Sequence, residues 1–172
     1  MSILAFDIAQ FFLLLNHYLL SLILLKAGFD PKVLTFFWDY LVGRKNSYCW
    51  NNFSSPSFSV DVGVGQGSTL LPVLSALYLS LILYLFKKQT KILKIPVSIL
   101  SFVDDGLFIA QNKFLTVSNS NLFCGYHIMT SLFKNFGLVI EHSKTEVFYF
   151  SRLHSTFNPP PLDLTILGGP IL

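Results

Sequence analysis

The chain has 172 residues, enough for a domain with a buried core. Hydrophobic residues make up 52% of it, and phenylalanine occurs 18 times. Charged residues make up only 12%, about half of the roughly 25% that is usual in soluble domains. Intrinsic disorder is therefore excluded, because disordered chains combine low hydrophobicity with high charge. The net charge of +3 is too small to indicate a nucleic-acid partner by itself.

The first part of the chain predicts a strand, two helices and a hairpin. Residues 2–9 have the pattern of a short strand. Residues 16–27 predict a helix that stops at Gly28, and Asp30 followed by Pro31 is typical of the start of a second helix, through residue 42. Aromatic and β-branched residues at 47–53 and 58–62 indicate two strands joined by a turn at 54–57.

The second part alternates helices with strands. A glycine-rich loop at residues 63–68 precedes a long helix at 69–88, and strands at 96–103 and 107–110 flank a hairpin turn formed by Asp104, Asp105 and Gly106. Residues 119–136 predict a helix, and residues 138–140 and 146–150 predict strands. Because helices are mixed with hairpins, the predicted fold class is α+β with a mainly antiparallel sheet.

An uncharged apolar stretch at residues 70–86 raises a different possibility. It is 17 residues long, and a membrane-spanning helix needs about 20 apolar residues. Lysines follow it, as they do at the cytoplasmic end of many spanning helices. The alternative hypothesis is therefore a small membrane-associated protein in which the acidic residues are incidental.

Three of the nine acidic residues stand inside apolar sequence: Asp7, Asp104 and Asp105. An unpaired buried carboxylate costs several kcal/mol, so such groups are usually paired, hydrogen-bonded or bound to a metal. Two adjacent strands would bring Asp7 beside Asp104, and carboxylate oxygens suit Mg²⁺. Two such ions about 3.5–4 Å apart catalyse phosphoryl transfer in many enzymes. Taken singly, Asp105 with Gly106 is more typical of a plain turn, and Asp7 of a helix cap.

Four sequence blocks follow one another in order: FDIAQFF at 6–12, GVGQGSTLLPVL at 63–74, FVDD at 102–105 and FGLVIEHSKT at 136–145. Together they resemble the palm of a reverse transcriptase, an RNA-directed DNA polymerase, of the LINE-type (non-LTR) retrotransposons of fungal genomes. The resemblance implies a palm-like antiparallel sheet backed by helices, with incomplete fingers and no thumb. It covers residues 1–155 as a partial palm, and residues 156–172 form a Pro/Gly-rich tail leading toward the thumb.

The resemblance implies a two-metal nucleotidyl transfer. Asp7 and Asp104 would be the main ligands of two Mg²⁺ ions, assisted by Asp105 and the backbone carbonyl of Ile8. The primer 3′-hydroxyl would attack the α-phosphate of a dNTP, and Lys144 matches the lysine that protonates the leaving pyrophosphate.

The resemblance also assigns residues that contact nucleotide and template. Phe12 matches a bulky side chain that would clash with a ribonucleotide 2′-hydroxyl, the group that distinguishes RNA from DNA. Gln66 and Gly67 match a loop that packs against nucleotide and template. These features disfavour an RNA-dependent RNA polymerase, the alternative among palm enzymes.

The implied partners are an RNA template, a DNA primer and a dNTP, and no stable membrane association is expected. The implied location of the protein is inside the cell, with the nucleus as one candidate compartment. Fingers and thumb are expected outside these 172 residues. We therefore expect the isolated chain to have little or no polymerase activity.

Overall fold

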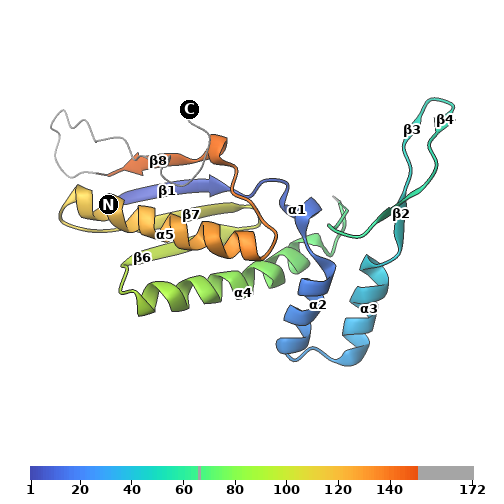
Figure 1. Cartoon of the computed structure of the whole chain (residues 1–172), viewed down its shortest axis with the longest axis horizontal. Coiled ribbons are helices and arrows are strands. Elements are labelled where there is room, and N and C mark those ends of the chain that lie inside the picture. Colours follow the sequence, from blue (N-terminus) through green and yellow to red (C-terminus); the bar gives the residue numbers. More distant parts are fainter. Residues whose placement is uncertain (66, 151–172) are drawn as a thin grey trace. The chain divides into compact units, whose positions relative to one another are not determined.

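The chain folds into two compact units (Figure 1). The computed structural model describes residues 1–65 and 67–150. The sheet unit comprises Met1–Ala9 and the chain from Ile82 onward, and the helical unit comprises Gln10–Leu81. The division falls inside the long helix α4 (Leu71–Ile92). The tail predicted at residues 156–172 lies outside the described residues.

The sheet unit is built on four antiparallel strands: β1 (Ser2–Asp7), β6 (Val97–Phe102), β7 (Asp105–Ala110) and β8 (Glu146–Tyr149). Their order across the sheet is β6-β7-β1-β8, so the first strand lies between two strands from the second half of the chain. Helix α5 (Leu115–Asn135) packs against β1, β6 and β7, and the short 3-10 helix η1 (His142–Lys144) follows it. This arrangement confirms the predicted α+β class.

Aromatic side chains fill the core of the sheet unit. Alternate residues of β1 are buried, because successive side chains of a strand point to opposite faces of the sheet. The Phe6 ring stacks on Phe108 with 4.8 Å between centroids and meets the edge of Phe133 at 6.0 Å. Phe108 also contacts Phe86 of α4 and Tyr126 of α5. The core therefore holds strands and helices together through one aromatic cluster.

Gly106 is required by this packing. It pairs with Phe6 across β1 and β7, and a Cβ atom at Gly106 would overlap the Phe6 ring. The ring therefore occupies the space that any side chain at position 106 would need. This contact allows one register between β1 and β7.

The helical unit contains α1 (Phe11–Leu14), α2 (His17–Lys26) and α3 (Pro31–Leu41). The predicted starts of α2 and α3 are confirmed by their caps. The Asn16 side chain accepts a hydrogen bond from the Leu19 amide at 2.9 Å, and Asp30 accepts one from the Lys32 amide at 2.8 Å. The short helix α1 was not predicted.

After α3 the chain forms one long hairpin rather than the predicted shorter one. Its outward side consists of β2 (Arg44–Asn46) and β3 (Cys49–Trp50), and its return consists of β4 (Phe53–Ser54) and β5 (Phe58–Val60). The predicted turn at residues 54–57 is wrong, because Trp50 pairs with Phe53 and the chain reverses between them. Asn51 makes this tight turn possible with a φ of 50°, a conformation that asparagine tolerates better than most residues.

Several other helix and strand boundaries differ from those predicted from the sequence, because tertiary contacts override local residue preferences. Asp105 and Gly106 belong to β7, and the turn is formed by Val103 and Asp104. Helix α4 continues to Ile92, and α5 begins at Leu115. The strand predicted at 138–140 is reduced to an isolated bridge between Ile8 and Ile140.

Helix α4 corresponds to the apolar stretch that suggested a membrane. By length and composition it is the one helix in the described part of the chain that could cross a bilayer. Core helices pass the same test, and Leu74, Tyr78, Ile82 and Phe86 of α4 are buried. Burial raises the pKa of Tyr78 to about 12, so this phenol is neutral at physiological pH.

We predict that Gly106→Ala lowers the free energy of unfolding by about 1–3 kcal/mol, the usual cost of overpacking a core. Urea unfolding followed by circular dichroism measures the change. Gly65→Ala is the matched control, because a Cβ at Gly65 meets no atom within 4 Å. In a Phe6→Leu background the smaller side chain should reduce the cost of the alanine. An equal cost in both backgrounds would contradict the proposed clash.

Candidate functional site

Two acidic residues lie opposite each other where the two central strands of the sheet meet, Asp7 at the end of β1 and Asp105 at the start of β7. The register of β1 and β7 places Asp7 directly opposite Asp105, one residue beyond the Phe6–Gly106 pair. Side chains of directly opposed residues project from the same face, with Cβ atoms about 4.5–5.5 Å apart. Phe6 points into the aromatic core, so Asp7 and Asp105 lie on the other face.

Asp104 lies beside this pair, in the two-residue turn between β6 and β7. Its carbonyl accepts a hydrogen bond from the Ile8 amide at 2.9 Å, which ties the turn to the end of β1. The preceding Val103 has a φ of 55°. A β-branched residue in this left-handed region costs of order 1–3 kcal/mol, and such strain is concentrated at functional sites. The structure thus pairs Asp7 with Asp105 by strand register and ties the backbone of Asp104, in the adjoining turn, to Ile8.

Lys144 reaches this group from the other end of the sequence. Its Nζ donates to Oδ2 of Asp7 at 2.5 Å, and the Asp7 side chain is only 17% exposed. The hydrogen bond and the charge of Asp7 raise the pKa of Lys144, and the charges of Glu141 and Asp104 act in the same direction. The ammonium group is therefore the counter-charge of an acidic cluster.

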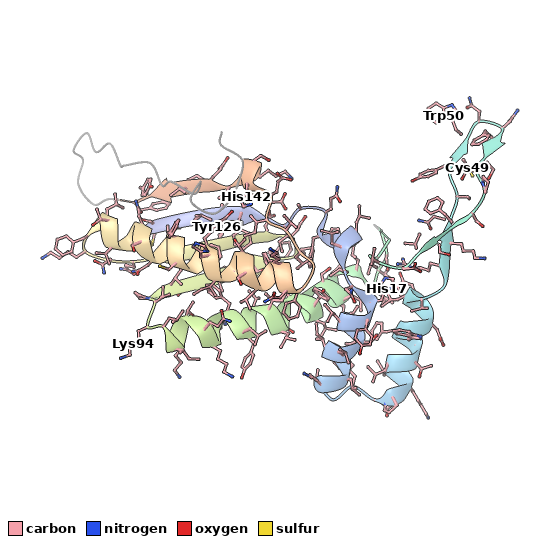
Figure 2. All side chains as sticks on the ribbon, viewed as in Figure 1. His17, Cys49, Trp50, Lys94, Tyr126 and His142 are labelled. Atoms are coloured by element: carbon pink, nitrogen blue, oxygen red, sulfur yellow. The ribbon has the colours of Figure 1, made fainter. Side chains whose placement is uncertain are left out.

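The segment that carries Lys144 is held by the backbone and by a buried tyrosine. The Glu141 amide donates to the Asp7 carbonyl, and the Ala9 amide donates to the Val139 carbonyl, both at 2.8 Å. The Tyr126 hydroxyl lies 2.5 Å from Nδ1 of His142, the first residue of η1 (Figure 2).

No sequence motif singles out Tyr126, and His142 shares no metal-site or catalytic spacing with the other histidines. Burial raises the pKa of Tyr126, so its hydroxyl stays protonated beside Nδ1 of His142. The two residues are 16 positions apart on different elements, and no local pattern connects them.

The donor chemistry of the acidic cluster fits Mg²⁺. Among residues 1–65 and 67–150, no three His, Cys, Asp or Glu side chains converge as a metal site. Mg²⁺ needs only one or two carboxylates, because waters and substrate phosphates complete its octahedron. Asp7 and Asp105 supply two such oxygen donors on one face, and Lys144 holds the Asp7 carboxylate in this structure.

Phe12 and the glycine-rich loop come together in the helical unit. The Val64 amide donates to the Phe12 carbonyl at 2.7 Å, and the Gly63 amide donates to the Leu15 carbonyl at 2.8 Å. Only glycine fits at position 63, because its φ is 79° and a Cβ would lie 2.7 Å from the Leu13 carbonyl oxygen.

The same loop is anchored by two further side chains. The buried His17 ring and the Arg44 guanidinium both contact the Gly63 carbonyl. Gly67 is exposed with a φ of 87°, and Gln66 lies outside the described residues.

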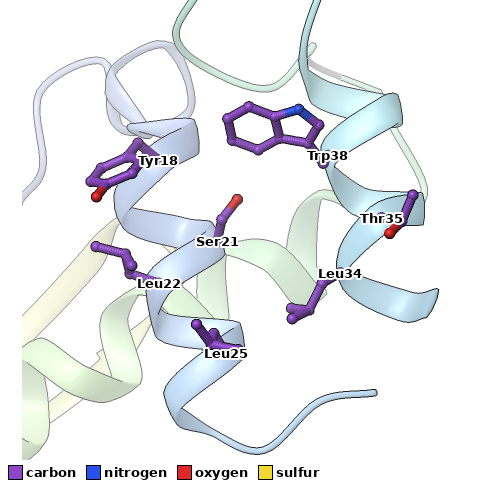
Figure 3. Close-up of a pocket in the computed structure, with 7 residues that line it drawn as sticks. All are labelled: Tyr18, Ser21, Leu22, Leu25, Leu34, Thr35 and Trp38. Atoms are coloured by element: carbon purple, nitrogen blue, oxygen red, sulfur yellow. The ribbon is translucent and has the colours of Figure 1, made fainter. Parts of the chain in front are cut away.

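The described part of the chain contains two surface hollows, one in each unit. One, of about 150 Å³, lies beside Asp105 in the sheet unit and is lined also by Leu100, Ser101, Phe102 and Leu107. The other, of about 330 Å³, is an apolar groove between α2 and α3. Figure 3 shows its lining, with the Trp38 indole on α3 and Tyr18 and Leu22 on α2. The second hollow contains no charged side chain and does not suggest a catalytic site.

Comparison with known proteins finds similarity in structure only. No protein-family model and no curated protein matches the sequence. Telomerase from Candida albicans, solved with a fragment of telomeric RNA, matches 86% of this chain with a TM-score of 0.67 and 15% identity. Apo telomerase from Candida tropicalis matches 90% with a TM-score of 0.54 and 16% identity. The chain spans 28% and 31% of these two structures, less than a third of their length.

We predict that Asp7→Asn lowers the pKa of Lys144 toward its ordinary value of 10.5. NMR titration of ¹³C-methylated lysines measures this shift, and Asp39→Asn on α3 is the matched control that should leave it unchanged. Because the folded state has the higher pKa, the ion pair stabilises the fold fully below pH 10.5 and loses this effect as pH rises through the folded-state value. An identical Lys144 titration in both variants would refute the pairing.

Proposed function

Since the chain has a reverse-transcriptase-like polymerase fold, we propose that it is the palm part of an RNA-directed DNA polymerase of the LINE-type (non-LTR) retrotransposon kind. The observation that carries this proposal is the register that sets Asp7 opposite Asp105, with Asp104 in the adjoining turn. The four sequence blocks that resemble this family support the finer assignment.

The proposed reaction is the addition of a dNTP to a primer 3′-hydroxyl. Asp7 and Asp104 would hold two Mg²⁺ ions, with help from Asp105 and the Ile8 carbonyl. When bound, the ions would activate the attacking hydroxyl and stabilise the charge on the leaving pyrophosphate. The carboxylates by themselves repel each other, and a cation among them relieves this repulsion.

Lys144 is the proposed proton donor to the leaving group. A lysine ammonium is protonated at neutral pH, which is the state that a proton donor needs. In this structure the ammonium pairs with Asp7, so a metal ion and Lys144 would compete for the same carboxylate. This competition is open to direct measurement.

Phe12 is the proposed selector against ribonucleotides, and Gln66 and Gly67 are the proposed template and nucleotide contacts. The backbone pairing of Val64 with Phe12 supports this grouping, since it sets the start of the loop beside the proposed selector.

The proposed partners are an RNA template, a DNA primer and a dNTP. The proposed location of the protein is inside the cell, with the nucleus as one candidate compartment. The similar Candida albicans telomerase was solved with RNA, which supports a nucleic-acid partner. The membrane-associated alternative is not favoured, because a polymerase-like fold accounts for α4 as a core helix with buried side chains.

We predict that the chain binds Mn²⁺, a spectroscopic substitute for Mg²⁺, and that Asp7→Asn and Asp105→Asn weaken the binding. The loss should be at least the roughly 10–100-fold that removal of an outer-shell partner costs. Lys144→Met should tighten binding by removing the competing ammonium. Electron paramagnetic resonance of free Mn²⁺ measures all of these, with Asp39→Asn as control. Equal affinities in Asp7→Asn and Asp39→Asn would refute the metal site.

We further predict that the 172-residue chain extends an oligo(dT) primer on poly(rA) only at background level. It spans less than a third of the two telomerase structures it resembles, and we expect a palm part alone to hold a primer–template duplex poorly. Incorporation of labelled dTTP measures the activity. Robust extension that disappears in Asp104→Asn would overturn the inactivity of the isolated chain while confirming the chemistry.

A further inference from the structure

The hairpin at residues 44–60, which we call the arm, has no role in the proposed chemistry. It follows α3 within the helical unit and consists of the β2–β5 and β3–β4 pairs. Figure 2 labels Trp50 at its free end. An isolated two-stranded hairpin is only marginally stable in water. A group of exposed apolar side chains on such a hairpin marks a candidate interaction surface.

Aromatic rings share one face of the arm. Trp50 pairs with Phe53, and directly opposed side chains project from the same face. Tyr48 directly precedes β3, and its ring lies 5.3 Å from that of Phe58. The exposed fractions are 71% for Tyr48, 77% for Trp50 and 63% for Phe53. These rings are therefore available to a partner.

The residues between the rings are small and polar. Residues 44–59 contain no Ala, Val, Leu, Ile or Met, and the rings are separated mainly by serine and asparagine. The cores of protein interfaces combine aromatic residues with methionine and other apolar groups in a continuous patch. Two pairs of rings, Trp50 with Phe53 and Tyr48 with Phe58, with polar residues beside them along the chain, match stacked bases more closely, because each base has a flat face and a polar edge.

The charge of the arm has one sign. No acidic residue occurs between Asp39 and Asp61, whereas Arg44 and Lys45 lie on β2. Arg44 is engaged with backbone carbonyls at the base of the arm, and Lys45 is exposed. A phosphate backbone would therefore meet a cation and no repelling carboxylate along the arm.

We propose that the arm binds single-stranded nucleic acid, with bases stacked on Trp50, Phe53 and Tyr48 and a phosphate near Lys45. Such stacking contributes about 1–3 kcal/mol per base and tolerates any sequence. The interaction requires no metal ion and no nucleotidyl transfer, so it goes beyond the proposed polymerase function and is measured in the presence of EDTA.

Intrinsic fluorescence tests the proposal directly. The chain has two tryptophans, so Trp38→Phe leaves Trp50 as the single reporter. Titration of this full-length variant with a 12-nucleotide single-stranded RNA should quench its emission. Anisotropy of labelled RNA should show that Trp50→Ala and Phe53→Ala each weaken binding roughly 5- to 150-fold. Phe36→Ala, which removes a 56% exposed ring from α3, is the matched control and should have no effect.

Salt dependence tests the phosphate contact. Lys45→Gln should reduce the slope of log K against log salt by about 0.7. RNA affinity unchanged in Trp50→Ala and Phe53→Ala would overturn the proposal. If light scattering also shows that these variants change the oligomeric state, the arm is a protein interface. If the unaltered chain binds RNA through the arm but does not bind Mn²⁺, the result counts against the polymerase assignment and leaves the proposal for the arm standing.

Discussion

The contact of the Phe6 ring with Gly106 is the constraint on which the sheet unit depends. It sets one register between β1 and β7, and the Phe6 ring then joins the buried cluster of Phe108 and Phe133. The next residue pair along the same strands is Asp7 and Asp105. A slip of one residue would move the acids into the apolar core and the rings into solvent. Hydrophobic packing on one face therefore determines the placement of carboxylates on the other.

Electrostatics on that second face complements the packing. Like charges on opposed residues are destabilising, and the Lys144 ammonium offsets the repulsion by pairing with Asp7. This ion pair joins residues 137 positions apart, so it requires the segment after α5 to be held against β1. Backbone hydrogen bonds from Glu141 and to Val139 and the Tyr126–His142 contact hold it there. The same lysine neutralises Asp7, and under the proposed function it would compete with a metal ion for that carboxylate.

Local chemistry made several elements predictable. The cap of α3 depends on Asp30, which the sequence identifies directly, because its side chain binds a backbone amide two residues later. The Asn16 cap of α2 is equally local. The turn before β7 was misplaced for the opposite reason. Asp105 and Gly106 are a typical turn pair, but the Phe6 ring requires a glycine inside the strand and thereby shifts the turn to Val103 and Asp104. A contact between residues 100 positions apart outweighed the local preference.

The sequence by itself determined which residues carry the candidate chemistry. Asp7, Asp104 and Asp105 stand out because carboxylates inside apolar segments require a partner. Tertiary structure alone decided that Asp105 faces Asp7 directly, that Lys144 is the counter-charge, and that Tyr126 supports its segment. The physical reason is one of range: burial preferences and helix caps act over a few neighbouring residues, whereas strand register and ion pairing depend on segments that meet only after the chain has folded.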